Sequence, residues 1–201
     1  MQVLIIEDDI GLAELIGQKL EEQNFSIAVA HDGAQAISRL QKKIPALMIL
    51  DYALPDISGE AFLQKIKTLN IDTPPFIVIT GRGDEKVAVE MMKSGARDYM
   101  IKDYDFLDLF PQVIERVRKE IENETKRREA EEKLIYQQKL LDDTQQLTKI
   151  GGWEYDVLKK EITWTKETFR IHGFDVHYIP TNSEELINRS IQCYGKKYRK
   201  E

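Results

Sequence analysis

The sequence predicts an α/β protein built on a five-stranded, doubly wound parallel sheet, followed by a long helix and a small α+β segment. Short apolar runs alternate five times with longer segments in which apolar residues recur at helical spacing. The runs at 46–50 and 76–79 are apolar throughout, as in strands covered by helices on both faces. This alternation is typical of a parallel sheet between two layers of helices.

Turn and capping residues set the expected boundaries of these elements. Asp9 and Asp84 are suitable N-caps, and Gly95 is a suitable residue just past a helix end. Pro111 suits the first turn of the last helix, which meets no Gly or Pro before about Thr148. We expect strands at 3–6, 25–30, 46–51, 76–80 and 99–101, and helices at 11–23, 34–40, 60–69, 84–93 and 111–148.

Composition and charge exclude several classes of protein. No apolar run approaches the roughly 20 residues that cross a bilayer, so no membrane association is predicted. Through Phe110 the chain carries 11 Lys and Arg against 18 Asp and Glu, an acidic balance that argues against nucleic-acid binding there. The only cysteine, Cys193, excludes an intrachain disulfide and fits a reducing compartment, so we expect a cytoplasmic protein.

Polar residues stand where four of the predicted strands end. Glu7 and Asp8 follow the first strand, Asp51 ends the third, Thr80 ends the fourth and Lys102 follows the fifth. In a parallel sheet these carboxyl ends share one edge, where such folds bind their ligands. Three carboxylates close together repel one another and favour a hard divalent cation, while a hydroxyl and an ammonium suit the oxygens of a transferred phosphoryl group.

Taken singly, these residues have simpler explanations. An acid after a strand is often a solvated loop residue or a helix cap, Thr80 is an ordinary strand-end hydroxyl, and Lys102 an ordinary surface lysine. Their joint placement at successive strand ends favours a site for phosphoryl transfer, with Asp51 as the nucleophile.

Residues 1 to about 120 resemble a response-regulator receiver domain, the phosphoacceptor of two-component signalling, which has a flavodoxin-like fold. The resemblance depends on the acidic run at 7–9, on Asp51 followed by Pro55 and Gly59, on Thr80, and on an aromatic residue three positions before Lys102. One departure is that Asp103 stands where the family usually has proline.

The resemblance implies specific roles for the acidic residues. Asp51 accepts a phosphoryl group from a histidine kinase or a phosphotransfer protein. Asp8, Asp51 and the backbone carbonyl of Ala53 bind Mg²⁺, and Glu7 assists through water.

It also implies a switch. Lys102 and Thr80 contact the phosphoryl oxygens, and Thr80 and Tyr99 then move together. This movement changes the face formed by the fourth helix, the fifth strand and the fifth helix.

The domain organisation is expected to be a receiver at 1–120, an extended helical linker at 111–149 and a partial sensory segment at 150–201. The linker fits either a solvated single helix or a parallel coiled coil that joins two copies of the chain, because its apolar seam is interrupted by the charged stretch 122–133. The last segment, with Trp153 and a second tryptophan at 164, resembles the opening of a PAS domain, and we expect it to bind no cofactor.

Two other functions stay open from the sequence. A Mg²⁺-dependent phosphatase would use Asp51 as its nucleophile, but such enzymes generally need an acid two positions later, where this chain has Ala53. The chain is alternatively a scaffold for protein contacts, as part of a longer hybrid sensor kinase. We expect a phosphoacceptor signalling domain and not an enzyme.

Overall fold

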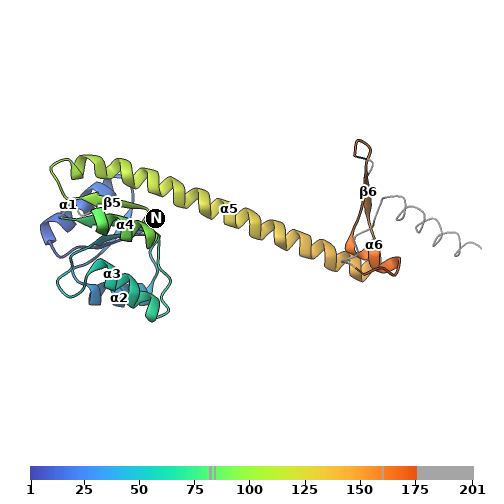
Figure 1. The fold of residues 1–201 in the computed structure, drawn as a ribbon, viewed down its shortest axis with the longest axis horizontal. Helices are drawn as coiled ribbons and strands as arrows, with labels where there is room; N and C mark the ends of the chain where they lie inside the picture. The colour runs from blue at the N-terminus through green and yellow to red at the C-terminus, as the bar shows by residue number, and fades with distance from the viewer. Residues whose placement is uncertain (82, 84, 160, 176–201) are drawn as a thin grey trace, which may run out of the picture. The chain divides into compact units, whose positions relative to one another are not determined.

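A computed structural model describes residues 1–81, 83, 85–159 and 161–175 (Figure 1). The chain divides into two compact units, the first spanning Met1–Thr125 and the second beginning at Lys126. The predicted N-cap Asp84, the thiol of Cys193 and the part of the PAS-like segment after Asp175 lie outside the described residues.

Five parallel strands form the sheet of the first unit, in the order β2-β1-β3-β4-β5. The strands are β1 (Gln2–Ile6), β2 (Ser26–Ala30), β3 (Leu47–Asp51), β4 (Phe76–Thr80) and β5 (Asp98–Ile101). Every residue of β3 and β4 is buried, which explains why both strands are apolar except for their last residues, Asp51 and Thr80. The predicted doubly wound sheet is confirmed. The strand order is that of flavodoxin-like folds, in which the winding direction reverses between β1 and β3.

Helices cover both faces of this sheet (Figure 1). They are α1 (Ile10–Glu22), α2 (Gly33–Lys42), α3 (Gly59–Thr68), α4 (Glu85–Lys93) and α5 (Phe106–Thr148). The apolar sides of α1 and of the first turns of α5 pack on one face, and those of α2, α3 and α4 pack on the other. Each face therefore has its own continuous core.

Polar side chains fix where the helices begin. Asp9, Asp32 and Ser58 each accept a hydrogen bond from the backbone N–H three residues further on, at the starts of α1, α2 and α3. The predicted cap at Asp9 is confirmed. Gly95 has a φ of 97°, the left-handed conformation that ends a helix and that glycine adopts without strain.

The prediction that Pro111 lies in the first turn of the last helix is wrong, because α5 already begins at Phe106. Phe106, Phe110 and Ile114 recur every four residues on one side of the helix and are at most 2 % exposed. Their burial against the sheet fixes the start of the helix. The missing N–H of Pro111 removes one intrahelical hydrogen bond to Leu107, which this packing outweighs.

Ion pairs join α5 to the region of β5. The guanidinium of Arg97, just before β5, donates two hydrogen bonds to the carboxylate of Glu124, at 2.7 and 2.6 Å. Arg116 of α5 binds Asp98 at 2.5 Å and Glu120 at 2.8 Å. A bidentate arginine–carboxylate pair fixes orientation as well as distance, so α5 is held to the first unit as far as Glu124.

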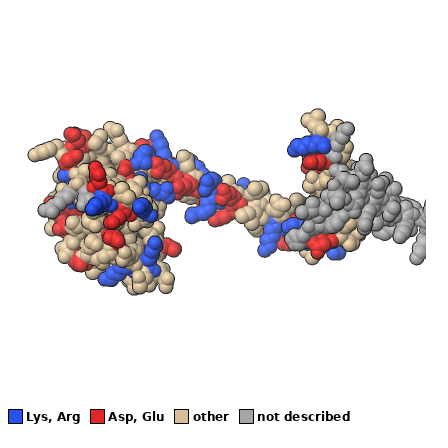
Figure 2. All heavy atoms as spheres, in the orientation of Figure 1, with Lys and Arg blue, Asp and Glu red and all other residues tan. Residues whose placement is uncertain are grey.

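Beyond Thr125, α5 carries mixed charges and then exposed apolar side chains. Basic and acidic residues lie side by side on its surface (Figure 2), with ion pairs such as Arg127–Glu131 four residues apart. The second unit continues with a hairpin of β6 (Trp153–Asp156) and β7 (Glu161–Trp164) and with the helix α6 (Lys166–Ile171). The hairpin and the short helix form the small α+β segment that the sequence predicts after the long helix. No helix in the described part of the chain combines the length and hydropathy that a bilayer crossing requires.

Candidate functional site

The structure brings the predicted polar residues together at the carboxyl edge of the sheet. Asp51 is the last residue of β3 and lies opposite Ile79 of β4, one residue before Thr80. Lys102 follows β5, and its backbone N–H donates to the carbonyl of Thr80 at 2.8 Å. The register of the strands therefore brings Asp51 and Lys102, which are 51 positions apart in the sequence, into one site.

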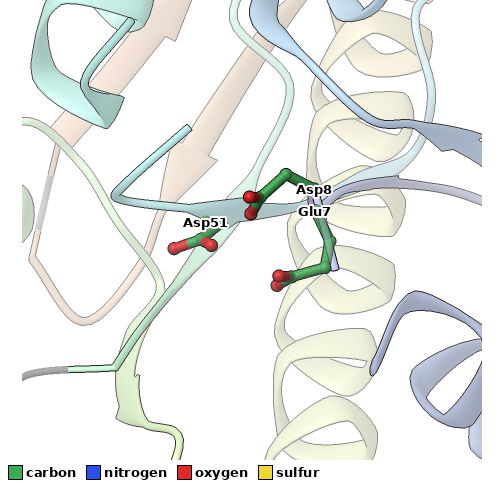
Figure 3. A group of neighbouring side chains, drawn as sticks. All are labelled: Glu7, Asp8 and Asp51. Atoms are coloured by element: carbon green, nitrogen blue, oxygen red, sulfur yellow. The ribbon is translucent and has the colours of Figure 1, made fainter. Parts of the chain in front are cut away.

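Three carboxylates form an acidic cluster at this edge (Figure 3). One oxygen each from Glu7, Asp8 and Asp51 lie within 4.8 Å of one another. Glu7 is fully buried and Asp51 is 3 % exposed, whereas Asp8 is exposed in the loop after β1. Charged groups packed so closely need a cation to offset their repulsion.

Lys102 supplies one positive charge to this acidic cluster. Its Nζ donates to Asp51 Oδ2 at 2.6 Å and to Glu7 Oε1 at 2.9 Å. Burial by itself lowers the pKa of Lys102, but the hydrogen bonds and charges of Asp51 and Glu7 outweigh it, so the pKa lies above its ordinary value. Lys102 is therefore protonated at neutral pH and holds the Asp51 carboxylate by one of its two oxygens.

Burial raises the pKa of Glu7 from its ordinary value of 4.5 to about 7, and the nearby charge of Asp51 acts in the same direction. The hydrogen bond and charge of Lys102 oppose this rise without cancelling it. Glu7 thus takes up a proton at a higher pH than an ordinary carboxyl group does.

Replacement of Glu7 by Gln is expected to change how stability depends on pH. A carboxyl group whose pKa rises on folding stabilises the folded state at low pH, and this contribution is lost as pH rises from about 4.5 to about 7. Each pKa unit corresponds to about 1.4 kcal/mol, so the loss amounts to about 3 kcal/mol. Urea unfolding of both proteins in EDTA between pH 4 and pH 8 measures it.

The difference between the two free energies of unfolding isolates Glu7, because the other carboxylates titrate in both proteins. We expect Glu7→Gln to gain stability relative to the parent as pH rises. A difference that does not vary with pH would show that the Glu7 carboxyl is not perturbed.

The donor set at the acidic cluster fits a hard divalent cation. All its ligand atoms are oxygens, which such ions prefer. Glu7 Oε2 is buried and accepts no hydrogen bond, although it lies 2.8 Å from Lys102 Nζ as part of the ion pair. Ala53, two residues after Asp51, is exposed in the following loop, and its N–H donates to Asp51 Oδ1 at 3.1 Å.

Thr80 and Tyr99, the two residues implied in the switch, lie on the neighbouring strands β4 and β5. Thr80 ends β4 and is 4 % exposed. Tyr99 pairs with Val78 in the sheet and is half-buried against the core between the sheet and α2, α3 and α4. The backbones of Thr80 and Lys102 are thus hydrogen-bonded where β4 and β5 end, and Tyr99 lies within β5, three residues before Lys102.

Two neighbouring side chains were not identified from the sequence. His31 follows β2, and its Nδ1 donates to the carbonyl of Glu7 at 2.9 Å. It stands at a strand end, so the reasoning that found Lys102 also applied to it. Asp56 lies in the loop after β3 and binds the start of α2. No local pattern connects Asp56 with residues 23 positions earlier.

Comparison with known proteins agrees with this geometry. Residues 3–114 match the response regulator receiver domain family. The transcriptional regulatory protein TrcR of Mycobacterium tuberculosis is 32% identical over 109 residues, which are 54% of this chain and 42% of TrcR. The phosphate regulon transcriptional regulatory protein PhoB of Rhizobium meliloti is 31% identical over 113 residues, which are 56% of this chain and 50% of PhoB.

Solved structures give the same result. A two-component response regulator from Clostridium difficile superposes with a TM-score of 0.52 at 27% identity, covering 59% of this chain and 96% of that one. The receiver domain of the Francisella response regulator 1452 gives a TM-score of 0.50 at 28% identity, covering 56% and 92%.

The chain belongs to the response regulator receiver family, the receiver part of two-component signalling. The match confirms the predicted family for the first unit. The chain spans half or less of the length of TrcR and PhoB, and the shared part is the receiver.

Proposed function

We propose that Asp51 accepts a phosphoryl group from a histidine kinase or a phosphotransfer protein, with Mg²⁺ as the cofactor. One observation carries the proposal: Asp51 ends β3 almost fully buried, with one oxygen 2.6 Å from Lys102 Nζ inside an acidic cluster. A carboxylate that a neighbouring ammonium holds by one oxygen is oriented for nucleophilic attack on phosphorus with the other.

Asp8, Asp51 and the backbone carbonyl of Ala53 would hold Mg²⁺, and Glu7 would assist through a bound water. When bound, the ion neutralises the clustered carboxylates and attracts the oxygens of the phosphoryl donor. Lys102 and Thr80 supply an ammonium and a hydroxyl to the same oxygens.

In the transfer, a carboxylate oxygen of Asp51 forms a bond to phosphorus while the bond from phosphorus to the donor's histidine nitrogen breaks. The bonding electrons return to the imidazole ring, which remains on the donor protein. Lys102 balances the negative charge that arrives at Asp51, because its raised pKa keeps it protonated. The product is an acyl phosphate on Asp51.

The new phosphate is the trigger for a change of shape. It adds about two negative charges and several acceptor oxygens beside Thr80. Thr80 moves toward them, and the ring of Tyr99 fills the space that is left. The face made of α4, β5 and α5 changes with it, and α5 is continuous from Phe106 to Thr148.

We extend the proposal to the organisation of the chain: a receiver at 1–120, a linker at 111–149 and the beginning of a PAS-like sensory domain at 150–201. The order of hairpin and short helix supports the last assignment. Exposed leucines of α5, such as Leu134 and Leu147, support pairing of the linker with a second copy of the chain.

Incubation of the protein with labelled acetyl phosphate and Mg²⁺ tests the proposed function. A receiver is expected to take up about one label per chain and to retain it after the donor is removed. Continuous release of inorganic phosphate without retained label would instead indicate a phosphatase. A chain that takes up no label is a scaffold. Because Ala53 stands two residues after Asp51 and offers no acid for turnover, we expect retention.

A further inference from the structure

The loop after Asp51, residues 52–58, is fixed at its base. The N–H of Gly59 donates to the carbonyl of Tyr52 at 2.7 Å, and Ala53 and Ser58 form an isolated bridge across the loop. Gly59 allows this closeness, since a Cβ there would lie 3.1 Å from the Cα of Tyr52. Ala53, the proposed carbonyl ligand, therefore belongs to a closed turn whose position depends on the rest of the loop.

The tip of the same loop is attached to the beginning of α2. Asp56 Oδ1 accepts from the N–H of Gly33 at 2.8 Å, and Oδ2 accepts from the N–H of Ala34 at 3.1 Å. Backbone N–H groups in the first turn of a helix have no partner within the helix, and the helix dipole favours an anion there. Asp32 already caps α2 through Gln35, so Asp56 is a second and separate attachment.

Packing at Gly33 supports this contact. A Cβ at Gly33 would lie 2.5 Å from Cγ2 of Ile57 and 3.3 Å from both carboxylate oxygens of Asp56. The loop tip thus rests directly on the backbone of Gly33, and any side chain at this position displaces it. Two independent contacts, one polar and one steric, hold the tip in the same place.

We propose that Asp56 and Gly33 are positioning residues that set the cation affinity of the acidic cluster without touching the cation. They attach the tip of loop 52–58 to α2, and this attachment keeps the Ala53 backbone where it faces Asp51. The inference rests on the proposed function, because it assigns these residues a role toward the Mg²⁺ that Asp51 and Ala53 would share.

Calorimetric titration of the full chain with Mg²⁺ alone, without any phosphoryl donor, tests the inference. Asp56→Ala and Gly33→Ala are expected to weaken Mg²⁺ binding by roughly 10-fold or more, the usual effect of losing a group that orients a ligand. Asp56→Asn keeps an acceptor oxygen and is expected to recover part of the affinity. In the double variant the losses should not add, because both changes release the same contact.

Asp32→Ala is the matched control. It removes the N-cap of α2, which costs about 1 kcal/mol of stability, but leaves the loop attached. We expect its Mg²⁺ affinity to equal that of the parent. Equal loss of affinity in Asp32→Ala and Asp56→Ala would overturn the inference, since general weakening of α2 would then explain both. Parental affinity in both Asp56→Ala and Gly33→Ala would also overturn it. Failure of the parent chain to bind Mg²⁺ would overturn the proposed function itself.

Discussion

Asp51→Asn is expected to take up no label from acetyl phosphate under conditions in which the parent chain is fully labelled. The amide has the shape of the carboxylate but lacks the anionic oxygen that attacks phosphorus. It also removes the charge that pairs with Lys102 at 2.6 Å. Intact-protein mass spectrometry and retained radiolabel both measure the outcome.

The control for this prediction is Asp72→Asn, which changes an exposed aspartate in the loop before β4. It makes the same chemical change outside the acidic cluster, and its labelling should match that of the parent. Label on Asp51→Asn at the parental rate would mean that another residue is the phosphoacceptor. The acidic cluster would then need a different explanation.

Lys102→Ala is expected to slow labelling by about 100-fold or more, the usual cost of removing a charged group that stabilises a transition state. The variant leaves Asp51 and Glu7 buried without the ammonium that binds them both. The same loss should also destabilise the folded protein at alkaline pH, where the raised pKa of Glu7 no longer keeps it neutral. Rates of labelling at saturating Mg²⁺ and urea unfolding curves measure the two effects.

Lys102→Arg separates charge from shape. Arginine restores the positive charge but cannot place a single compact donor 2.6 Å from Asp51 and 2.9 Å from Glu7. We expect its stability to approach that of the parent, while its labelling remains slow. Labelling of Lys102→Ala within twofold of the parent would show that the ammonium takes no part in the transfer.

The sheet and the site could be predicted because both depend on short, regular patterns. Strands β3 and β4 are buried on both faces, so their sequences are apolar without interruption. Once the strands are placed, topology brings their carboxyl ends together. That is how Lys102 and Glu7, 95 positions apart, could be assigned to one site.

Other features could not be found in this way, for two physical reasons. The contact between Asp56 and Gly33 joins a loop to a helix end, and neither partner has a periodic signal. The start of α5 was predicted too late because proline is common in the first turn of a helix, which favoured a start at Pro111. In the structure the helix begins at Phe106, where burial of Phe106 and Phe110 decides its start. Tertiary packing outweighed a local preference there.

The pair between Arg97 and Glu124 bears on where the receiver of this chain ends. The family match stops at residue 114, yet Val117 is fully buried and Ile121 packs on the same core. A chain that ended at residue 114 would lose Val117 and Ile121 from its hydrophobic core. It would also leave the guanidinium of Arg97 without the carboxylate of Glu124. In this protein, the part of α5 up to Thr125 therefore belongs to the receiver and completes its hydrophobic core, and the second compact unit begins only at Lys126.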